Sequence, residues 1–332
     1  MIYLILMVIF LVLFLSTVLH FALEKKTTYE NLNGKHVVIT GGSSGIGKAS
    51  ALEVSRLGAH VTVIGRDEER LKAAVSEIKA KSTNSSGQKI QYAALDVTAG
   101  YDAIAKCFTS LEAEIGSIFM LINSAGSCTC GQFENMKVED IKQMIDLNYF
   151  GTALPTKYVL PGMKKRKEGI VVFVSSEAAL LGIYGYSAYS GGKWAVRGLA
   201  ESLLMELVGT GVSLTLAFPP DTDTPGFEKE ELTKPEETKL ISGSGGLQSP
   251  DKVGKQLVQD ALNRKTYSVF GISGQLMSLL YCGSVDSVAQ VWMQICSMGA
   301  LRAVMVGVLI SFQMIVKDGL KKKSLKETAK TK

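Results

Sequence analysis

Tyr189 and Lys193 lie four residues apart and could together transfer a proton. We predict a helix over residues 188–207, and on a helix this spacing places both side chains on one face. A phenol ordinarily has a pKa of about 10, which makes it a weak acid at neutral pH. A lysine charge beside it favours the phenolate and lowers that pKa toward the working range. The pair is a candidate acid–base group, although the same spacing also occurs on ordinary helix surfaces.

Two further polar side chains could complete this site. Ser176 stands at the end of a predicted strand, where its hydroxyl could bind the same substrate oxygen as Tyr189. Asn148 lies in a predicted helix over residues 137–159 and could bond the backbone or hold a water beside Lys193. The candidate catalytic residues are therefore Tyr189, Lys193, Ser176 and Asn148, of which Ser176 and Tyr189 also bind substrate.

A glycine-rich turn lies between a predicted strand over residues 36–40 and a predicted helix over 45–57. Its glycines let the chain turn sharply and let a pyrophosphate approach the backbone, while the helix N-terminus supplies N–H groups and a partial positive charge. Tight turns use glycine for other reasons too, but the strand-turn-helix setting favours dinucleotide binding. The candidate ligands here are Gly41, Ser43, Ser44, Gly45 and Gly47.

The end of the second predicted strand favours NADPH as the cofactor. An NAD-type fold usually has an acidic residue at this point for the ribose 2′-hydroxyl. Here Gly65 leaves room, and Arg66 could bind a 2′-phosphate with help from Ser43 and Arg70. The alternative is that Arg66 is a solvated loop residue. Asp67 is explained as a helix N-cap rather than as an NAD determinant.

Two more strand ends supply candidate cofactor contacts. Asp96 follows the third strand and could hold the adenine edge, and Asn123 ends the fourth and could line the cofactor groove. Each position is equally explained as an ordinary turn after a strand.

The elements that must position these residues alternate between apolar strands and amphipathic helices. This order predicts an α/β fold, a Rossmann-type doubly wound parallel sheet covered by helices on both faces. A seventh strand is expected near residues 267–271, after a helix from Ser249 to about residue 264. The first six predicted strands are 36–40, 61–64, 90–94, 119–123, 169–175 and 212–217, and the helices are 45–57, 67–80, 100–115, 137–159 and 188–207.

Composition and charge exclude several classes of protein. The chain has 332 residues, of which 46% are hydrophobic, so it can bury a core and is neither disordered nor fibrous. Residues 317–332 hold seven lysines and two acidic residues, which equals the whole net charge of +5. Residues 1–316 therefore sum to zero and carry no basic face for nucleic acid.

The cysteines and histidines indicate no metal site and no hydrolase. Five scattered cysteines do not make a disulfide framework, which suits a reducing environment. Cys128 and Cys130 have no second ligand pair near them, and packing is the simpler role. Only three histidines are present, which leaves a histidine-based triad poorly supplied.

Both ends of the chain point to a membrane, and the mean hydropathy of +0.19 agrees. Residues 1–25 begin with an uncharged apolar run that we interpret as an uncleaved anchor; a signal peptide is the alternative. Lys25 and Lys26 would keep the following domain in the cytosol. Residues 271–316 are apolar and expected to be membrane-associated, before a basic cytosolic tail over 317–332 that could face anionic lipid.

Between the two ends we expect one Rossmann-fold reductase domain over residues 34–270. Within it, residues 221–250 are rich in glycine, serine, proline and charge, without clear periodicity. A loop of this length in a compact domain is usually functional, so we interpret it as a lid over the substrate.

These features together resemble the short-chain dehydrogenase/reductase family. The T-G-x-x-x-G-x-G loop, N-x-A-G after the fourth strand, the helical asparagine, the serine and Y-x-x-x-K occur in family order over residues 36–270. The resemblance implies that Tyr189 is the general acid and that Lys193 binds the nicotinamide ribose while lowering the tyrosine pKa. It also implies that Ser176 orients the carbonyl and that Asn148 supports a proton relay.

The chain departs from the family pattern in two places. Ser124 replaces the usual second asparagine, and Pro219-Pro220 replaces Pro-Gly after the sixth strand. The second change stiffens the entry to the lid without removing a catalytic group. Thr224 still stands where the family's threonine would hold the nicotinamide carboxamide.

The segment 219–242 and the two apolar ends are similar to those family members that reduce a long-chain sphingoid ketone. This narrower resemblance implies NADPH-dependent reduction of 3-ketosphinganine to sphinganine, for sphingolipid synthesis, on the cytosolic face of the endoplasmic reticulum membrane. A membrane-bound reductase of a steroid or retinoid ketone is the alternative. A catalytically silent, nucleotide-sensing membrane scaffold is an alternative of another class. Membrane lipid is an expected partner, nucleic acid is not, and a homo-oligomer stays open.

Overall fold

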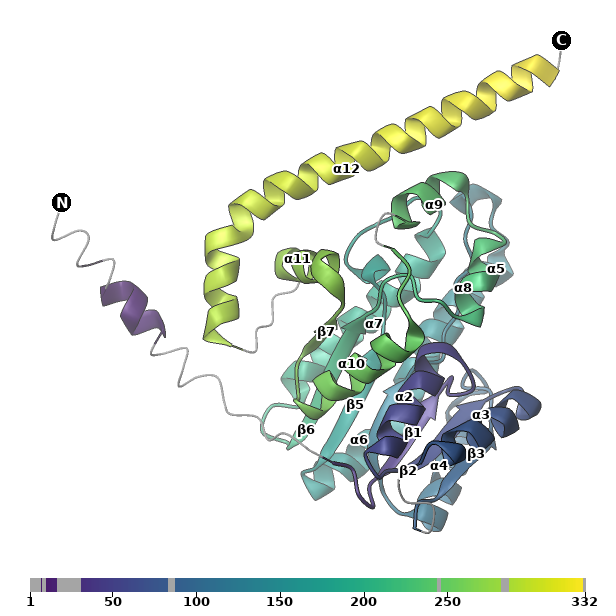
Figure 1. The fold of residues 1–332 in the computed structure, drawn as a ribbon, viewed down its shortest axis with the longest axis vertical. Coiled ribbons are helices and arrows are strands. Elements are labelled where there is room, and N and C mark those ends of the chain that lie inside the picture. Colours follow the sequence, from purple (N-terminus) through teal and green to yellow (C-terminus); the bar gives the residue numbers. More distant parts are fainter. Residues whose placement is uncertain are drawn as a thin grey trace.

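A seven-stranded parallel sheet forms the centre of the molecule, in the order β3-β2-β1-β4-β5-β6-β7 (Figure 1). The computed structural model describes residues 7, 10–16, 31–82, 87–243, 246–281 and 287–330, without the side chains of 323, 324 and 326–330. The strands are β1 (His36–Thr40), β2 (His60–Gly65), β3 (Ile90–Ala94), β4 (Ile118–Asn123), β5 (Gly169–Val174), β6 (Val212–Phe218) and β7 (Tyr267–Val269).

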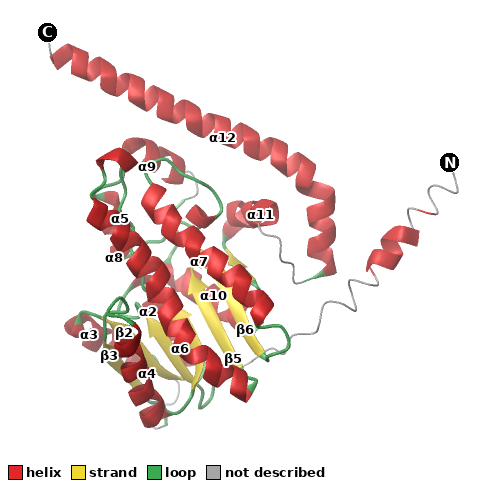
Figure 2. Ribbon diagram, turned by 180° about the vertical axis from the view of Figure 1, so that it is seen from behind, coloured by secondary structure: helices red, strands yellow, loops and turns green. Residues whose placement is uncertain are grey.

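Helices cover both faces of this sheet, which confirms the predicted doubly wound fold (Figures 1 and 2). One apolar cluster joins the sheet to α2 (Gly45–Arg56), α3 (Glu68–Ala80) and α10 (Pro250–Leu262). A second cluster joins the other face to α4 (Tyr101–Ile115), α6 (Gly151–Arg166) and α7 (Ser187–Glu206). Because both faces are buried, the strands are continuous apolar runs, which is why they could be recognised from sequence.

The strand order reverses beside β1, which pairs with β2 on one side and β4 on the other. In open parallel sheets the segments leaving the carboxyl ends diverge at such a point and leave a crevice between them. The chain segments that follow β1, β2, β4 and β5 all carry candidate site residues. The topology therefore brings these residues to one edge of the sheet.

The predicted single helix over residues 137–159 is wrong in detail. The structure has α5 (Val138–Ile145), a π-helical turn η2 (Asp146–Phe150) and then α6. Pro155 in α6 lacks an N–H and so removes one hydrogen bond from the helical ladder. Asn148 lies within the wider π turn, and such turns frequently occur at functional sites.

The lid segment, residues 221–250, is more ordered than the expected loop. It contains α8 (Pro225–Glu231) and α9 (Glu236–Ser242), and a parallel bridge between Thr222 and Gln248 joins its two ends. The side chain of Lys234 is fully buried and forms ion pairs of 2.7 to 3.4 Å with acidic residues. Helices this short leave too little periodicity to be recognised in the sequence.

The apolar end of the chain forms α11 (Gly271–Tyr281) and the long helix α12 (Val288–Lys330), which passes over α11 and α9 (Figure 1). Residues 317–330 of the expected basic tail continue α12 instead of forming a separate segment; they contain no proline, and Gly319 alone does not end the helix. Among the described residues, Val288–Lys322 is long and apolar enough to cross a membrane.

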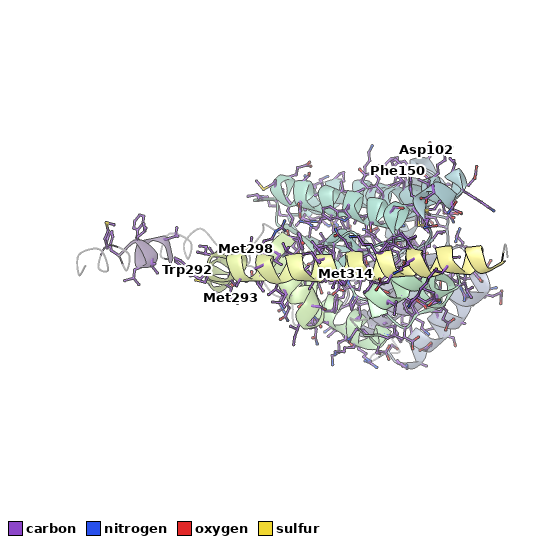
Figure 3. All side chains as sticks on the ribbon, turned by 90° about the horizontal axis from the view of Figure 1, so that it is seen from above. Asp102, Phe150, Trp292, Met293, Met298 and Met314 are labelled. Carbon is purple, nitrogen blue, oxygen red and sulfur yellow. The ribbon has the colours of Figure 1, made fainter. Side chains whose placement is uncertain are left out.

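The expected anchor over residues 1–25 lies largely outside the described residues, as do His20, Lys25 and Lys26. Its described part is an exposed helix over residues 10–16. The Trp292 indole donates a 2.8 Å hydrogen bond to Ser16 Oγ, which joins this helix to the first turns of α12 (Figure 3). The two apolar ends of the chain therefore contact each other.

Candidate active site

A cavity of about 650 Å³ lies at the carboxyl edge of the sheet and extends to α12. Segments that follow β1 to β6 line it, together with the lid segment, α11 and α12. Most of the predicted site residues meet there, although they come from distant parts of the sequence. These are Gly41, Ser43, Ser44, Gly45, Arg66, Arg70, Asp96, Ser176, Tyr189, Lys193 and Thr224.

The glycine-rich turn has the geometry of a phosphate cradle. Gly41 and Gly45 adopt φ values of +68° and +53°, which favour glycine. Gly47 does not line the cavity. A Cβ at this position would lie 2.3 Å from the Gly41 carbonyl oxygen, so the absence of a side chain at Gly47 lets the start of α2 pack against Gly41. Ser44 caps α2 without a side-chain hydrogen bond, which leaves the first N–H groups of the helix available to an anion.

Two arginines lie at the end of β2, beside this turn. Arg66 is 64% exposed, and its guanidinium is 3.7 Å from the Asp96 carboxylate. The backbone N–H of Arg70 donates to Asp67, which caps α3 as expected from the sequence. The arginines are thus held only by exposed contacts, and both guanidinium groups are available to a phosphate.

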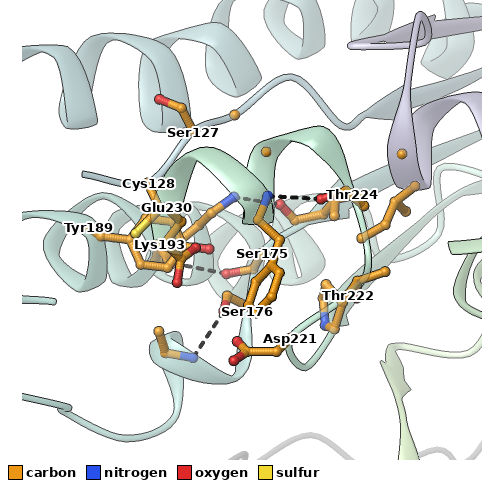
Figure 4. A pocket seen from close by; sticks show the side chains of 18 of the residues that line it. Ser127, Cys128, Ser175, Ser176, Tyr189, Lys193, Asp221, Thr222, Thr224 and Glu230 are labelled. Atoms are coloured by element: carbon orange, nitrogen blue, oxygen red, sulfur yellow. Dashed lines mark hydrogen bonds between the residues drawn. The ribbon is translucent and has the colours of Figure 1, made fainter. Parts of the chain in front are cut away.

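Ser176, Tyr189 and Lys193 lie together in the middle of the cavity (Figure 4). Ser176 is the N-cap of the short 3-10 helix η3 (Glu177–Ala179), and its Oγ accepts a 3.2 Å hydrogen bond from the Ala178 N–H. Lys193 Nζ donates a 2.9 Å hydrogen bond to the Val174 carbonyl and lies 5.8 Å from the centre of the Tyr189 ring. The strand end thus positions both the serine and the lysine.

Burial controls the protonation of this group. It raises the pKa of Tyr189 well above its ordinary value. Negative neighbours, Glu230 and Asp221 among them, raise this pKa further, whereas a hydrogen bond with Ser176 lowers it. Burial also lowers the pKa of Lys193 to about 8. The phenol is therefore protonated at neutral pH, as an acid must be before it acts. The lowering of the tyrosine pKa by Lys193 stays a prediction for the reacting complex.

The two asparagines have different surroundings, and neither lines the cavity. The Asn148 amide donates to the carbonyls of Ser127 and Met144, both at 3.0 Å. Its Oδ1 is buried without a hydrogen-bond partner among the described residues. A Cβ on Gly126 would lie 2.8 Å from this oxygen and 3.3 Å from Lys193 Nζ. Asn123 instead donates to Thr156 at 3.1 Å, so its side chain supports α6 and does not reach the cofactor groove.

Thr224 connects the lid segment to the glycine-rich turn. Its Oγ1 accepts a 3.1 Å hydrogen bond from the Phe227 N–H and so caps α8. A Cβ on Gly45 would lie 2.9 Å from the methyl group of Thr224, so the lid segment packs closely on the glycine-rich turn. The threonine is therefore in place to close the cofactor end of the cavity.

Sequence reasoning missed a second polar cluster beside Tyr189. Cys128 and Cys130 have their sulfur atoms 3.5 Å apart, and both lie near the Glu230 carboxylate. That carboxylate accepts a hydrogen bond from the Tyr186 hydroxyl and forms an ion pair with Lys234, whose Nζ lies 3.0 Å from Glu230 Oε1. It is thus already compensated, which weighs against metal binding by these three groups.

The far end of the cavity was also missed, because it is formed by the last two helices. Ser273, Leu276 and Met277 of α11 line it, as do Val304, Met305, Val308 and Phe312 of α12. Met305 is only 8% exposed on a helix that is mostly exposed. An apolar sequence alone does not show which of its residues face a cavity.

The family model described as short chain dehydrogenase matches residues 35–235. The chain belongs to this family. It is 42% identical to a 3-dehydrosphinganine reductase of Danio rerio over 86% of each chain. It is 42% identical to a 3-ketodihydrosphingosine reductase of Bos taurus over 90% of each chain, and 36% identical to a 3-dehydrosphinganine reductase of Arabidopsis thaliana over 74% of each.

Membership of this family, together with relatives named as reductases, indicates an oxidoreductase that acts on a ketone with a nicotinamide cofactor. The residues that line the cavity fit such a cofactor: a glycine cradle at a helix N-terminus, two available guanidinium groups, and a buried lysine beside a tyrosine. The cavity has room beyond these groups for a substrate, since it continues to α12.

Proposed function

We propose that the protein reduces 3-ketosphinganine to sphinganine with NADPH. The relatives named for this reaction come from a fish, a mammal and a plant, and they match most of the chain. The observation that carries the proposal is the continuity of one cavity from Ser176 and Tyr189 to the apolar side chains of Met305 and Phe312. A ketone on a long alkyl chain needs both a polar reacting end and an apolar path of this kind.

In the proposed reaction, NADPH held by the glycine-rich turn, Arg66 and Lys193 would supply the hydride for C3 of the substrate. Ser176 holds the carbonyl oxygen by a hydrogen bond, and Tyr189 gives its proton to that oxygen as negative charge develops on it. The π bond of the carbonyl is replaced by a C–H bond and an O–H bond while the C–O single bond remains, and the tyrosine is left as a phenolate. Lys193 stabilises the phenolate and binds the nicotinamide ribose.

Asn148 completes the proton path in this proposal. Its unpartnered Oδ1 faces the same small space as Lys193 Nζ, so a water held there could return a proton toward Tyr189. The preference for NADPH rests on Arg66, assisted by Ser43 and Arg70, because a guanidinium binds a 2′-phosphate by charge-assisted hydrogen bonds. Asp96 would bind the adenine side, and Thr224 the carboxamide.

We place the protein in the endoplasmic reticulum membrane, with residues 34–270 facing the cytosol. Residues 1–25 would be an anchor and 271–316 a membrane-associated segment, supported by the length and apolar composition of α12. The lysines of 317–332 would lie beside anionic lipid. The substrate would then enter sideways from the bilayer, and the lid segment would close over it.

The test is NADPH oxidation by the detergent-solubilised full chain given 3-ketosphinganine, with NADH, a steroid ketone and a retinoid ketone in parallel. We expect sphinganine to form and NADPH to be consumed in equal amounts. Turnover of only the steroid or retinoid ketone would support the proposed catalytic residues but reject 3-ketosphinganine as the substrate. NADPH binding without reduction of any ketone would favour a silent nucleotide-sensing scaffold.

A further inference from the structure

Three carboxylates line the cavity near the reacting groups: Glu177, Asp221 and Glu230. Two of them, Asp221 and Glu230, lie close enough to Tyr189 to influence its pKa, and Figure 4 shows Glu230 near the tyrosine and Asp221 near Ser176. Buried carboxylates are costly unless a cation or hydrogen-bond donors compensate them. The partners of each therefore indicate which one is free to bind a ligand.

Asp221 and Glu230 are compensated within the protein. Lys234 Nζ lies 3.4 Å from Asp221 and 3.0 Å from Glu230, and its side chain is fully buried. Tyr186 also donates to Glu230. Lys234 Nζ also lies 2.7 Å from Glu231, so three carboxylates share this cation. Asp221 and Glu230 each keep a cation within ion-pair distance and hold the lid segment in place.

Glu177 is different, because no cation pairs with it in the described part of the chain. Its Oε1 is buried without a hydrogen-bond partner and lies against α11, where a Cβ on Gly274 would be 3.0 Å away. Burial, together with repulsion from Asp221, raises the pKa of Glu177 to about 7. This is the uncompensated carboxylate of the cavity.

We propose that Glu177 binds the ammonium group on C2 of the substrate, an inference that rests on the proposed reduction of 3-ketosphinganine. That substrate carries its amine on the carbon next to the ketone. Ser176 would bind the ketone oxygen, and Glu177 is the next residue in the chain. Adjacent protein groups thus recognise adjacent substrate groups.

This pairing makes Glu177 a residue that determines specificity. An arriving ammonium gives the buried carboxylate the cation it lacks, in a setting where such a bond is stronger than in water. A neutral ketone cannot do this and leaves the carboxylate uncompensated. The site therefore discriminates between an aminoketone and a steroid or retinoid ketone by charge, in addition to shape.

The experiment compares 3-ketosphinganine with the matched ketone in which hydrogen replaces the amino group. For each substrate kcat/KM is measured at saturating NADPH, and their ratio is the amine selectivity. Loss of one charge-assisted hydrogen bond predicts that Glu177→Gln reduces this selectivity by about tenfold to a hundredfold. Glu177→Asp, which keeps the charge, should retain more selectivity than the glutamine variant.

Two further carboxylates provide the comparison. Glu228 is exposed on α8 and does not line the cavity, so Glu228→Gln should leave the selectivity at the wild-type value. Asp221→Asn tests the neighbouring acid. If its selectivity falls while that of Glu177→Gln does not, the ammonium binds Asp221 and the inference is overturned.

The outcomes separate this inference from the proposed function. No reduction of 3-ketosphinganine by the wild-type protein would reject the function itself. Reduction with the same amine selectivity in wild type and Glu177→Gln would reject only the role of Glu177. If that variant fails to bind NADPH, it has not folded, and inhibition of the wild-type enzyme is measured instead. Sphinganine should then inhibit with a binding constant more than about tenfold tighter than that of its deaminated analogue. Equal binding of the two compounds would overturn the inference.

Discussion

The two ends of the cavity are built in different ways. At the cofactor end, loops leave buried parallel strands, and close backbone contacts such as that between Gly47 and Gly41 leave little freedom. At the far end, α11 and α12 are added after the last strand, and few of their side chains are buried. The candidate catalytic groups are thus held by the core of the fold, whereas the apolar path is formed by a peripheral segment.

The difference has an energetic reason. Residues of β1 are fully or almost fully buried and contribute the apolar burial that stabilises the sheet. The apolar window of α12 is only 6% buried, so its surface adds little to folding and is available to lipid. Changes at the cofactor end should therefore affect chemistry, and changes at the far end should affect which substrates bind.

The largest effect is expected from Tyr189→Phe. Removing the acid should lower kcat for ketone reduction by about a hundredfold to ten-thousandfold, because Tyr189 is the group that we propose to protonate the developing alkoxide. NADPH binding, followed by fluorescence, should persist. Tyr184→Phe is the matched control: Tyr184 bonds Gln132 outside the cavity, and its loss should leave kcat near the wild-type value. Near-normal turnover by Tyr189→Phe would remove the tyrosine from the mechanism.

A smaller, cofactor-specific effect is expected from Arg66→Ala. Loss of a charge-assisted contact to the 2′-phosphate should raise the KM for NADPH by about tenfold to a hundredfold and change the KM for NADH little. Arg56→Ala removes an exposed arginine at the other end of α2 and should have neither effect. Equal losses for both cofactors would contradict the phosphate role.

The smallest effect is expected at the far end, from Met305→Ser. Losing apolar contact with the substrate tail should raise the KM for 3-ketosphinganine by roughly threefold to tenfold and leave a short-chain aminoketone analogue almost unaffected. Met314 lies on the same helix, is 60% exposed and does not line the cavity, so Met314→Ser is the control. An equal change in KM for long and short ketones would show that the far end of the cavity does not bind the alkyl chain.

Much of the fold could be predicted because its signals are local. Buried parallel strands are short apolar runs, and β1 and β3 begin and end where the sequence indicated. The glycine turn and the spacing of Tyr189 and Lys193 lie within single elements, so they too could be recognised without a structure. The π turn at Asn148 could not, since it depends on how α5 and α6 pack around it.

The doubly wound sheet, the candidate acid–base pair and the glycine-rich turn could be predicted from the sequence alone, because each depends on residues close together in the chain. Only the tertiary structure decided that Asn123 supports a helix while Glu177 lies uncompensated in the cavity. It also decided that α12 lines that cavity through Met305. These properties depend on which distant groups meet, and burial and charge compensation exist only once the chain has folded.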